Sequence, residues 1–192
     1  MKRFKGFQRG INLGGWLSQF DDNTKEYFDT FIVEQDIKNI AEMGLDHVRL
    51  PIDYSIIEDE QGNEKIEGYR YIDHCVQWCK QYGLHLILDL HHTFGYTFDP
   101  LIEIEDREAF FKEKALQDRF VTLWKRLAKR YGNDKDIAFE LLNEVISGEI
   151  RNEWNAIALR AIQEIHKITP ETYVILGGVY YNNVRSVPDL PA

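Results

Sequence analysis

The chain has 192 residues, enough for one domain with a sizeable core, and we expect residues 1–192 to form a single domain. Its 44% hydrophobic and 29% charged residues are typical of a soluble globular protein. A formal net charge of -9 argues against nucleic acid and against an anionic membrane surface as partners, whereas a neutral ligand such as a sugar is compatible.

The N-terminus is basic, but no apolar segment follows it, so we expect no secretion signal. No run approaches the roughly 18 apolar residues of a membrane span. The compartment is therefore expected to be cytoplasmic by default, or the protein is exported with a signal outside these residues.

Cys75 and Cys79 lie four positions apart on an apolar stripe, which indicates core thiols rather than a disulfide or a metal pair.

In chain order, short apolar runs alternate with longer amphipathic segments. The runs predict strands at residues 10–13, 47–51, 84–90, 137–142 and 173–176. The segments between them predict helices with apolar stripes in residues 33–41, 72–79, 120–131 and 154–168. The first three stripes end at Gly44, Gly83 and Gly132, and glycine tolerates the left-handed conformation of a helix C-cap.

This alternation implies parallel strands with right-handed crossovers, in either an open doubly wound sheet or a barrel. The glycine-rich residues 10–15 fit neither a dinucleotide fingerprint nor a phosphate loop. Polar residues instead follow several different strands, which favours the barrel. A full barrel needs about 250 residues. We therefore expect an α/β fold of the (β/α)8 TIM-barrel type, incomplete at its C-terminal side, with about five βα units.

The apolar run at residues 139–142 ends in a carboxamide and a carboxylate, Asn143 and Glu144. Parallel α/β proteins place their chemistry where such a strand ends, so this pair is a candidate catalytic site. The alternatives are a structural ion pair or cap for Glu144 and a turn contact for Asn143.

His91 and His92 also end a strand. Neighbours on a strand point to opposite faces and no third ligand stands at useful spacing, so we expect no metal.

Four motifs together resemble glycoside hydrolase family 5, the cellulase family. They occupy residues 9–17, 48–51, 88–92 and 139–144, in the order of the family, and the resemblance covers about residues 7–178. It implies the N-terminal portion of the barrel, strands one to five. Two features depart from the family. Val145 stands where the family usually has proline, and the family's nucleophilic Glu on strand seven, its His-Tyr pair on strand six and its Trp on strand eight have no counterpart here.

The resemblance implies a role for each strand-end residue. Glycoside hydrolysis uses two carboxyl groups, which lie about 5–5.5 Å apart in retaining enzymes. Glu144 would be the general acid/base, kept protonated by partial burial and a nearby second carboxylate. Asn143 would hydrogen-bond the sugar 2-hydroxyl. Arg49 would hold the nucleophile ionised, and His91 would hydrogen-bond the substrate or the nucleophile.

Further residues are candidates for substrate binding. His92 would line a sugar subsite, and Tyr54, Tyr181 and Trp16 would stack on sugar rings, with plain packing as the alternative for each. The polar and aromatic residues 93–111 predict a loop on the substrate side. Arg49 has a structural alternative as well, an ion pair with Asp89 or Glu140.

The sequence therefore predicts a retaining hydrolase of β-linked glucans, β-1,4 or β-1,3, that needs no metal or organic cofactor. Because the nucleophile is expected outside these residues, the chain alone should be inactive, and open sheet edges would favour self-association. The alternatives are a barrel that binds carbohydrate without cleaving it, a fragment of a larger enzyme, or a doubly wound enzyme with another substrate.

Overall fold

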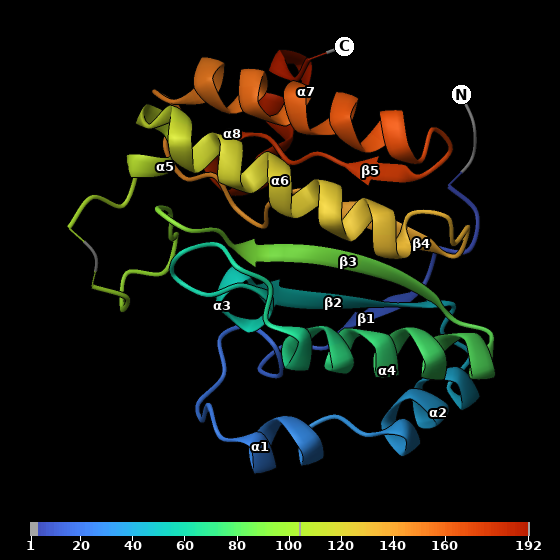
Figure 1. Ribbon diagram of the computed structural model, residues 1–192. Helices are drawn as coiled ribbons and strands as arrows, with labels where there is room; N and C mark the ends of the chain where they lie inside the picture. Colours follow the sequence, from blue (N-terminus) through green and yellow to red (C-terminus); the bar gives the residue numbers. More distant parts are fainter. Residues whose placement is uncertain (1–3, 104, 192) are drawn as a thin grey trace. The chain divides into compact units, whose positions relative to one another are not determined.

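The computed structural model describes residues 4–103 and 105–191 (Figure 1). The chain divides into two compact units, Met1–Asp89 and Leu90–Ala192, and the third strand crosses the boundary. In the described residues the strands follow one another in the sheet in the order β1-β2-β3-β4-β5. Their bounds are Gly10–Asn12, His47–Asp53, His85–His92, Ile137–Glu140 and Tyr173–Ile175. All the strands predicted from apolar runs are thus present, with ends that shift by one to two residues.

In the first unit, β1 and β2 pair in parallel, with Gly10 opposite His47. Glycine leaves room here for the His47 ring, because a Cβ at Gly10 would lie 2.2 Å from that ring unless the His47 side chain moved. Val48, Leu50 and Ile52 alternate along β2 and are fully buried, so the face of β2 that carries them lies in the core.

The helices of the first unit are α1 Lys25–Thr30, α2 Glu34–Glu42, α3 Tyr54–Ile57 and α4 Ile66–Tyr82. In Figure 1, α4 runs along β2 and lies between the strands and α2, with which it is in contact. Gly83 ends α4 in the predicted left-handed conformation, at φ 70°. Cys75 and Cys79 are buried free thiols on the face of α4 that forms the core.

In the second unit, β4 and β5 pair in parallel, with Ala138 opposite Tyr173. β4 ends at Glu140, two residues before the predicted end. The next residue still follows the strand, because the Leu141 amide donates to the carbonyl of Ile175 at 3.2 Å. The chain is therefore still hydrogen-bonded to β5 one residue after the end of β4, and Asn143 and Glu144 follow shortly after.

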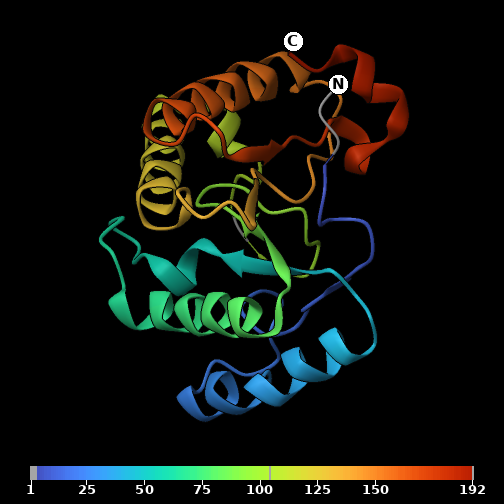
Figure 2. The ribbon, with the colours of Figure 1, turned by 90° about the vertical axis from the view of Figure 1, so that its right-hand side faces the viewer.

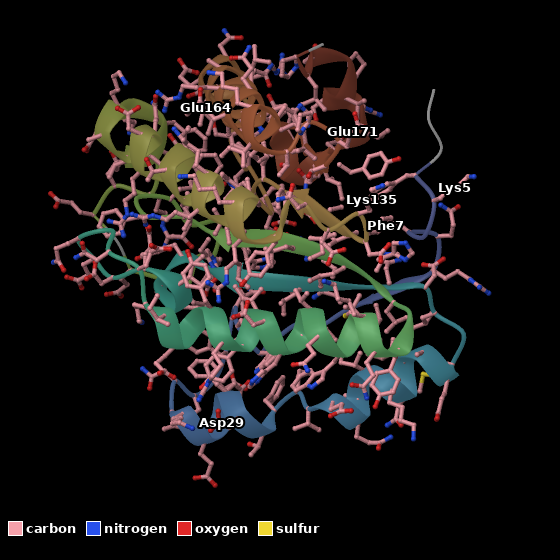
Figure 3. The ribbon with its side chains drawn as sticks, turned by 45° about the vertical axis from the view of Figure 1, so that its right-hand side comes forward. Lys5, Phe7, Asp29, Lys135, Glu164 and Glu171 are labelled. Atoms are coloured by element: carbon pink, nitrogen blue, oxygen red, sulfur yellow. The ribbon has the colours of Figure 1, made fainter. Side chains whose placement is uncertain are left out.

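The helices of the second unit are α5 Ala109–Lys112, α6 Lys114–Tyr131, α7 Arg151–Ile168 and the short α8 Val179–Asn182, followed by a 3-10 turn, η1 Val184–Asp189. α6 packs against α7 (Figure 2). An ion pair joins them, since Lys125 lies 3.2 Å from Glu164, the residue labelled on α7 in Figure 3. The sequence did not predict α1, α3, α5, α8 or η1, which are all too short for a clear apolar period.

Gly132 differs from the prediction. It ends α6 but has φ -70°, in the right-handed region, so a left-handed cap does not explain the glycine. Close packing does, because a Cβ at this position would lie 2.6 Å from the Thr169 side chain. The Thr172 hydroxyl also donates to the Gly132 carbonyl at 2.6 Å.

Candidate active site

Four of the predicted site residues lie at the ends of β3 and β4 in the second unit. His91 and His92 are the last residues of β3, and both are buried. Asn143 and Glu144 follow β4 in a loop and are half-buried. The Asn143 amide donates to the carbonyl of Leu90 at 3.1 Å, which ties the start of this loop to the end of β3. These four residues thus lie at the end of β3 and in the loop after β4, and the roles assigned to them stay predictions.

The backbone around Glu144 is held by Tyr96, which lies in the loop after β3. The Tyr96 hydroxyl donates to the carbonyl oxygen of Glu144 at 2.7 Å and accepts from the amide of Ile146 at 3.0 Å. Burial raises the pKa of Tyr96, so the phenol stays protonated and keeps its ability to donate. Sequence reasoning missed this residue.

The same loop is held from a second side by the turn after β5. The Asn182 side-chain amide donates to the carbonyl of Asn143 at 2.5 Å, and the Tyr181 amide donates to the carbonyl of Val145 at 3.2 Å. Together with Tyr96, this turn engages the carbonyl oxygens of three successive residues, 143 to 145. The loop that carries the candidate acid/base is therefore fixed along its backbone.

The turn after β5 has an unusual backbone. Tyr180, Tyr181 and Asn182 have φ values of 57°, 58° and 57°, in the left-handed region that residues with a Cβ avoid. This conformation costs about 1–2 kcal/mol per residue, and such strain is concentrated at functional sites. Both tyrosine rings are more than half exposed. The turn therefore presents two aromatic rings to solvent beside the Glu144 loop.

A hollow of about 270 Å3 opens next to this turn. Arg151, Tyr180, Asn183, Arg185 and Ser186 line it. Its lining combines polar side chains, which can hydrogen-bond to hydroxyl groups, with one tyrosine. This combination suits a sugar ring, which carries several hydroxyl groups. Neither Tyr180 nor the hollow was predicted, although two tyrosines and two asparagines a few residues after a strand were a signal in the sequence.

The two histidines meet an aromatic residue of the following loop. Phe98 stacks on His92 with ring centroids 4.7 Å apart and planes within 3°. It meets His91 edge-on at 5.2 Å. One face of the His92 ring is thus covered by Phe98, which narrows the ways in which His92 can contact a ligand.

In the first unit, Arg49 has the structural partner that the sequence analysis left open. Its Nη2 lies 2.9 Å from Oδ2 of Asp89, which is fully buried, and its Nη1 donates to the Asn12 side chain at 2.9 Å. These two contacts, one from each terminal nitrogen to a different side chain, fix the guanidinium in place. The ion-pair interpretation is confirmed, and the proposed contact with a nucleophile stays a prediction.

The two aromatic candidates of the first unit differ in access. Trp16 is only 1% exposed, its Nε1 donates to the carbonyl of Phe28 at 2.9 Å, and its ring stacks with Trp78. It has the environment of a core side chain, which leaves no ring face for a sugar. Tyr54 follows β2 directly and is half-buried, so it keeps an accessible edge.

Within residues 4–103 and 105–191, no group of three or more His, Cys, Asp or Glu side chains is arranged to hold a metal ion. In the same described part of the chain, no helix is long and apolar enough to cross a membrane.

Parallel strands that alternate with helices, with a carboxylate and a carboxamide after one of them, are the arrangement found in α/β-barrel proteins. The family described as Cellulase (glycosyl hydrolase family 5) matches residues 8–191. The chain belongs to this family, and the predicted fold class and family resemblance are confirmed.

Named relatives support this assignment. The chain is 46% identical to Endoglucanase C of Acetivibrio thermocellus over 187 residues, which are 96% of the chain and 53% of that protein. It is 47% identical to Cellodextrinase A of Ruminococcus flavefaciens over 184 residues, 95% of the chain and 53% of that protein. The chain thus spans about half the length of these curated relatives.

Solved structures show the same fold. Cel5A of Thermotoga maritima in complex with cellobiose superposes with a TM-score of 0.78 at 23% identity, covering 98% of this chain and 57% of that one. The cellulose synthase subunit Z of Clostridioides difficile gives a TM-score of 0.78 at 26% identity, covering 97% and 57%.

Proposed function

We propose that the protein hydrolyses β-1,4-linked glucans with retention of configuration, and that Glu144 is its general acid/base. The observation that carries the proposal is the Asn143–Glu144 pair in the loop that follows β4, a loop whose backbone is held from two sides. The relatives at 46–47% identity, named endoglucanase and cellodextrinase, favour β-1,4-glucan as the substrate.

The chemistry proceeds in two steps. In the first, Glu144 gives its proton to the glycosidic oxygen as the C1–O bond breaks, and a second carboxylate forms a bond to C1. In the second, water attacks C1, Glu144 takes a proton from it, and the C1–carboxylate bond breaks. The net reaction adds one water molecule and leaves Glu144 protonated again.

The neighbouring residues have supporting roles in the proposal. Asn143 donates to the sugar 2-hydroxyl, a contact that strengthens in the transition state. His91 and His92 contact the substrate from the end of β3, and Arg49, held by Asp89, orients the nucleophile.

Sugar rings stack on exposed aromatic residues. Tyr181 is 58% exposed and Tyr180 lines the hollow beside the Glu144 loop, so these two rings are the platforms that we propose in the second unit. In the first unit Tyr54 takes this role.

We also propose that the nucleophile is not among residues 1–192. The family places it on strand seven, whereas the motifs of this chain match strands one to five. A polypeptide of residues 1–192 is therefore expected to release no reducing sugar from cellotetraose. Release that is abolished by Glu144→Gln would contradict this part of the proposal.

The test of the function uses the full-length protein, meaning the whole polypeptide that its gene encodes and that carries residues 1–192, with cellotetraose, laminaritetraose and mannotetraose. We expect cleavage of cellotetraose, and we expect Glu144→Gln to lower kcat about 10²- to 10⁴-fold, the usual contribution of an acid/base. Glu149→Gln, an exposed glutamate in the same loop, is the matched control and should leave kcat unchanged.

Two outcomes would contradict the proposal. If Glu144→Gln retains wild-type kcat, Glu144 is not the acid/base. If the wild-type protein binds cellotetraose but cleaves none of the three tetrasaccharides, the protein binds carbohydrate without hydrolysing it. Preferential cleavage of laminaritetraose would instead identify β-1,3-glucan as the substrate. A relative from Aspergillus fumigatus named probable glucan 1,3-beta-glucosidase A gives this alternative weaker support, because its identity is only 27%.

A further inference from the structure

We propose that Tyr96 is a positioning residue for Glu144 and that its hydroxyl sets the placement of the acid/base relative to the glycosidic oxygen. This inference rests on the proposed function of Glu144.

Tyr96 itself has a fixed place. It closes a tight turn after β3, in which its amide donates to the carbonyl of Thr93 at 3.1 Å. Gly95 occupies the third position of the turn with φ 82°, a conformation that residues with a Cβ rarely adopt. The Gly95 carbonyl accepts from the amide of Phe110 in α5 at 3.0 Å. The backbone before Tyr96 is thus anchored both to the end of β3 and to α5.

The ring of Tyr96 is also held. It is 4% exposed and meets Phe111 of α5 edge-on, with centroids 4.9 Å apart and planes at 76°. Phe111 in turn meets the buried Trp154 of α7. A ring packed in this way directs its hydroxyl to one position, so that position is set by the core and not by the loop that it contacts.

The hydroxyl bridges the backbone on both sides of Val145. It donates to the carbonyl of Glu144 and accepts from the amide of Ile146, so it uses both its donor and an acceptor site. These two bonds fix the orientation of the peptide group that begins at Glu144. That orientation determines the direction in which the Glu144 side chain leaves the backbone. The Tyr96 hydroxyl, 48 positions earlier in the sequence, therefore controls the position of the Glu144 carboxyl group.

The turn after β5 holds the flanking carbonyls of Asn143 and Val145 independently of Tyr96. Loss of the Tyr96 hydroxyl therefore releases the carbonyl of Glu144, while the carbonyls of Asn143 and Val145 keep their hydrogen bonds. We expect Tyr96→Phe to fold, to bind substrate as the wild-type protein does, and to hold Glu144 less accurately.

Leaving-group dependence distinguishes this role from a structural one. Phenyl β-cellobioside has a poor leaving group that needs a proton from the acid, whereas 2,4-dinitrophenyl β-cellobioside needs none. In the full-length protein, we expect Tyr96→Phe to lower kcat/KM for the phenyl substrate about ten- to a hundredfold, since small misplacements have effects of this size. For the dinitrophenyl substrate kcat/KM should stay within about twofold of wild type, since this substrate needs no general acid.

Tyr131→Phe is the matched control. It removes the same atom from a buried tyrosine at the end of α6, which leads into β4 at the edge opposite to Glu144. It should leave both kcat/KM values unchanged. Equal losses on the two substrates in Tyr96→Phe, or no loss on either, would overturn the proposal.

Two further measurements keep the test decisive. Glu144→Gln must show the same leaving-group dependence more strongly; if it does not, the proposed function of Glu144 fails, whatever Tyr96→Phe shows. Should Tyr96→Phe not fold by circular dichroism, replacement of Tyr96 by 4-aminophenylalanine keeps an N–H donor to Glu144 but weakens the acceptor for Ile146. A loss confined to the phenyl substrate supports the proposal, and equal or absent losses overturn it.

Discussion

The hydroxyl of Tyr96 lies 2.7 Å from the carbonyl oxygen of Glu144, across 48 positions of sequence. The loop after β3 thus holds the loop after β4 through a single side chain. Because the carbonyl and not the carboxylate is contacted, the acid/base keeps its side chain available for substrate while its backbone is fixed. This arrangement suits a group that must meet a glycosidic oxygen in a defined geometry.

The left-handed turn after β5 predicts a difference between two substitutions at Asn182. Both Asn182→Ala and Asn182→Gly remove the amide that donates to the Asn143 carbonyl. Glycine also removes the steric cost of the left-handed φ, whereas alanine raises it. Asn182→Gly should therefore be about 1 kcal/mol more stable than Asn182→Ala, as measured by urea unfolding. Equal stability, or a more stable alanine variant, would contradict the observed backbone.

The ion pair between Arg49 and Asp89 predicts a large loss of stability. Asp89 is fully buried, and its carboxylate lies 2.9 Å from the guanidinium. Removal of one partner from such a pair leaves an uncompensated charge, which costs about 3–5 kcal/mol. We expect Asp89→Ala to lower the free energy of unfolding by this amount.

Asp29→Ala is the control for that measurement, because Asp29 on α1 (Figure 3) pairs with Lys25 at the surface. Its effect should be much smaller. A change for Asp89→Ala that is no larger than for Asp29→Ala would contradict a structural role for the buried pair.

The thiols of α4 should be unreactive in the folded protein. The hydrogen bond with Cys79 and burial both raise the pKa of Cys75, and a raised pKa leaves less of the nucleophilic thiolate. Ellman's reagent at pH 8 is therefore expected to label neither thiol in buffer and both in denaturant. Rapid labelling without denaturant would show that this face of α4 is accessible.

The lowered pKa of Asp46 predicts that the fold loses stability in acid. Partial burial opposes its ionisation, but hydrogen bonds from His47 and from the amides of Arg9 and Gln8 prevail and hold the pKa below its usual value. A lowered folded pKa stabilises the fold above the unfolded value, about 3.9. The stability advantage of wild type over Asp46→Asn should be constant from pH 7 to about 5 and shrink as the pH falls further. An advantage that grows in acid would contradict this sign.

Much of the fold was predictable because β2, β3 and β4 are largely buried runs, and polar residues follow β3 and β4 within a few positions. The predicted ends of these two strands, residues 90 and 142, each lie two positions from the observed ends at His92 and Glu140. Gly132 shows where local rules fail, since its small size is required by Thr169, which lies far along the chain.

The support of the site was not predictable. The Tyr96 hydroxyl donates to a backbone carbonyl. Every residue type has this carbonyl, so the sequence does not indicate which residue Tyr96 contacts. The turn at residues 180–182 is left-handed, and although Asn182 tolerates this conformation, the two tyrosines before it give no local signal for it. Trp16 shows the reverse case, because a tryptophan after a strand fits a sugar platform and a core position equally well until its neighbours are known.

The pH dependence of kcat/KM for phenyl β-cellobioside tests the central claim, that Glu144 supplies the proton, most directly. In the full-length protein the wild-type rate should fall at alkaline pH, as the acid loses its proton. In Glu144→Gln this alkaline limb should disappear while the acidic limb remains. If the variant keeps the wild-type alkaline limb, another group donates the proton and the assignment of Glu144 is wrong.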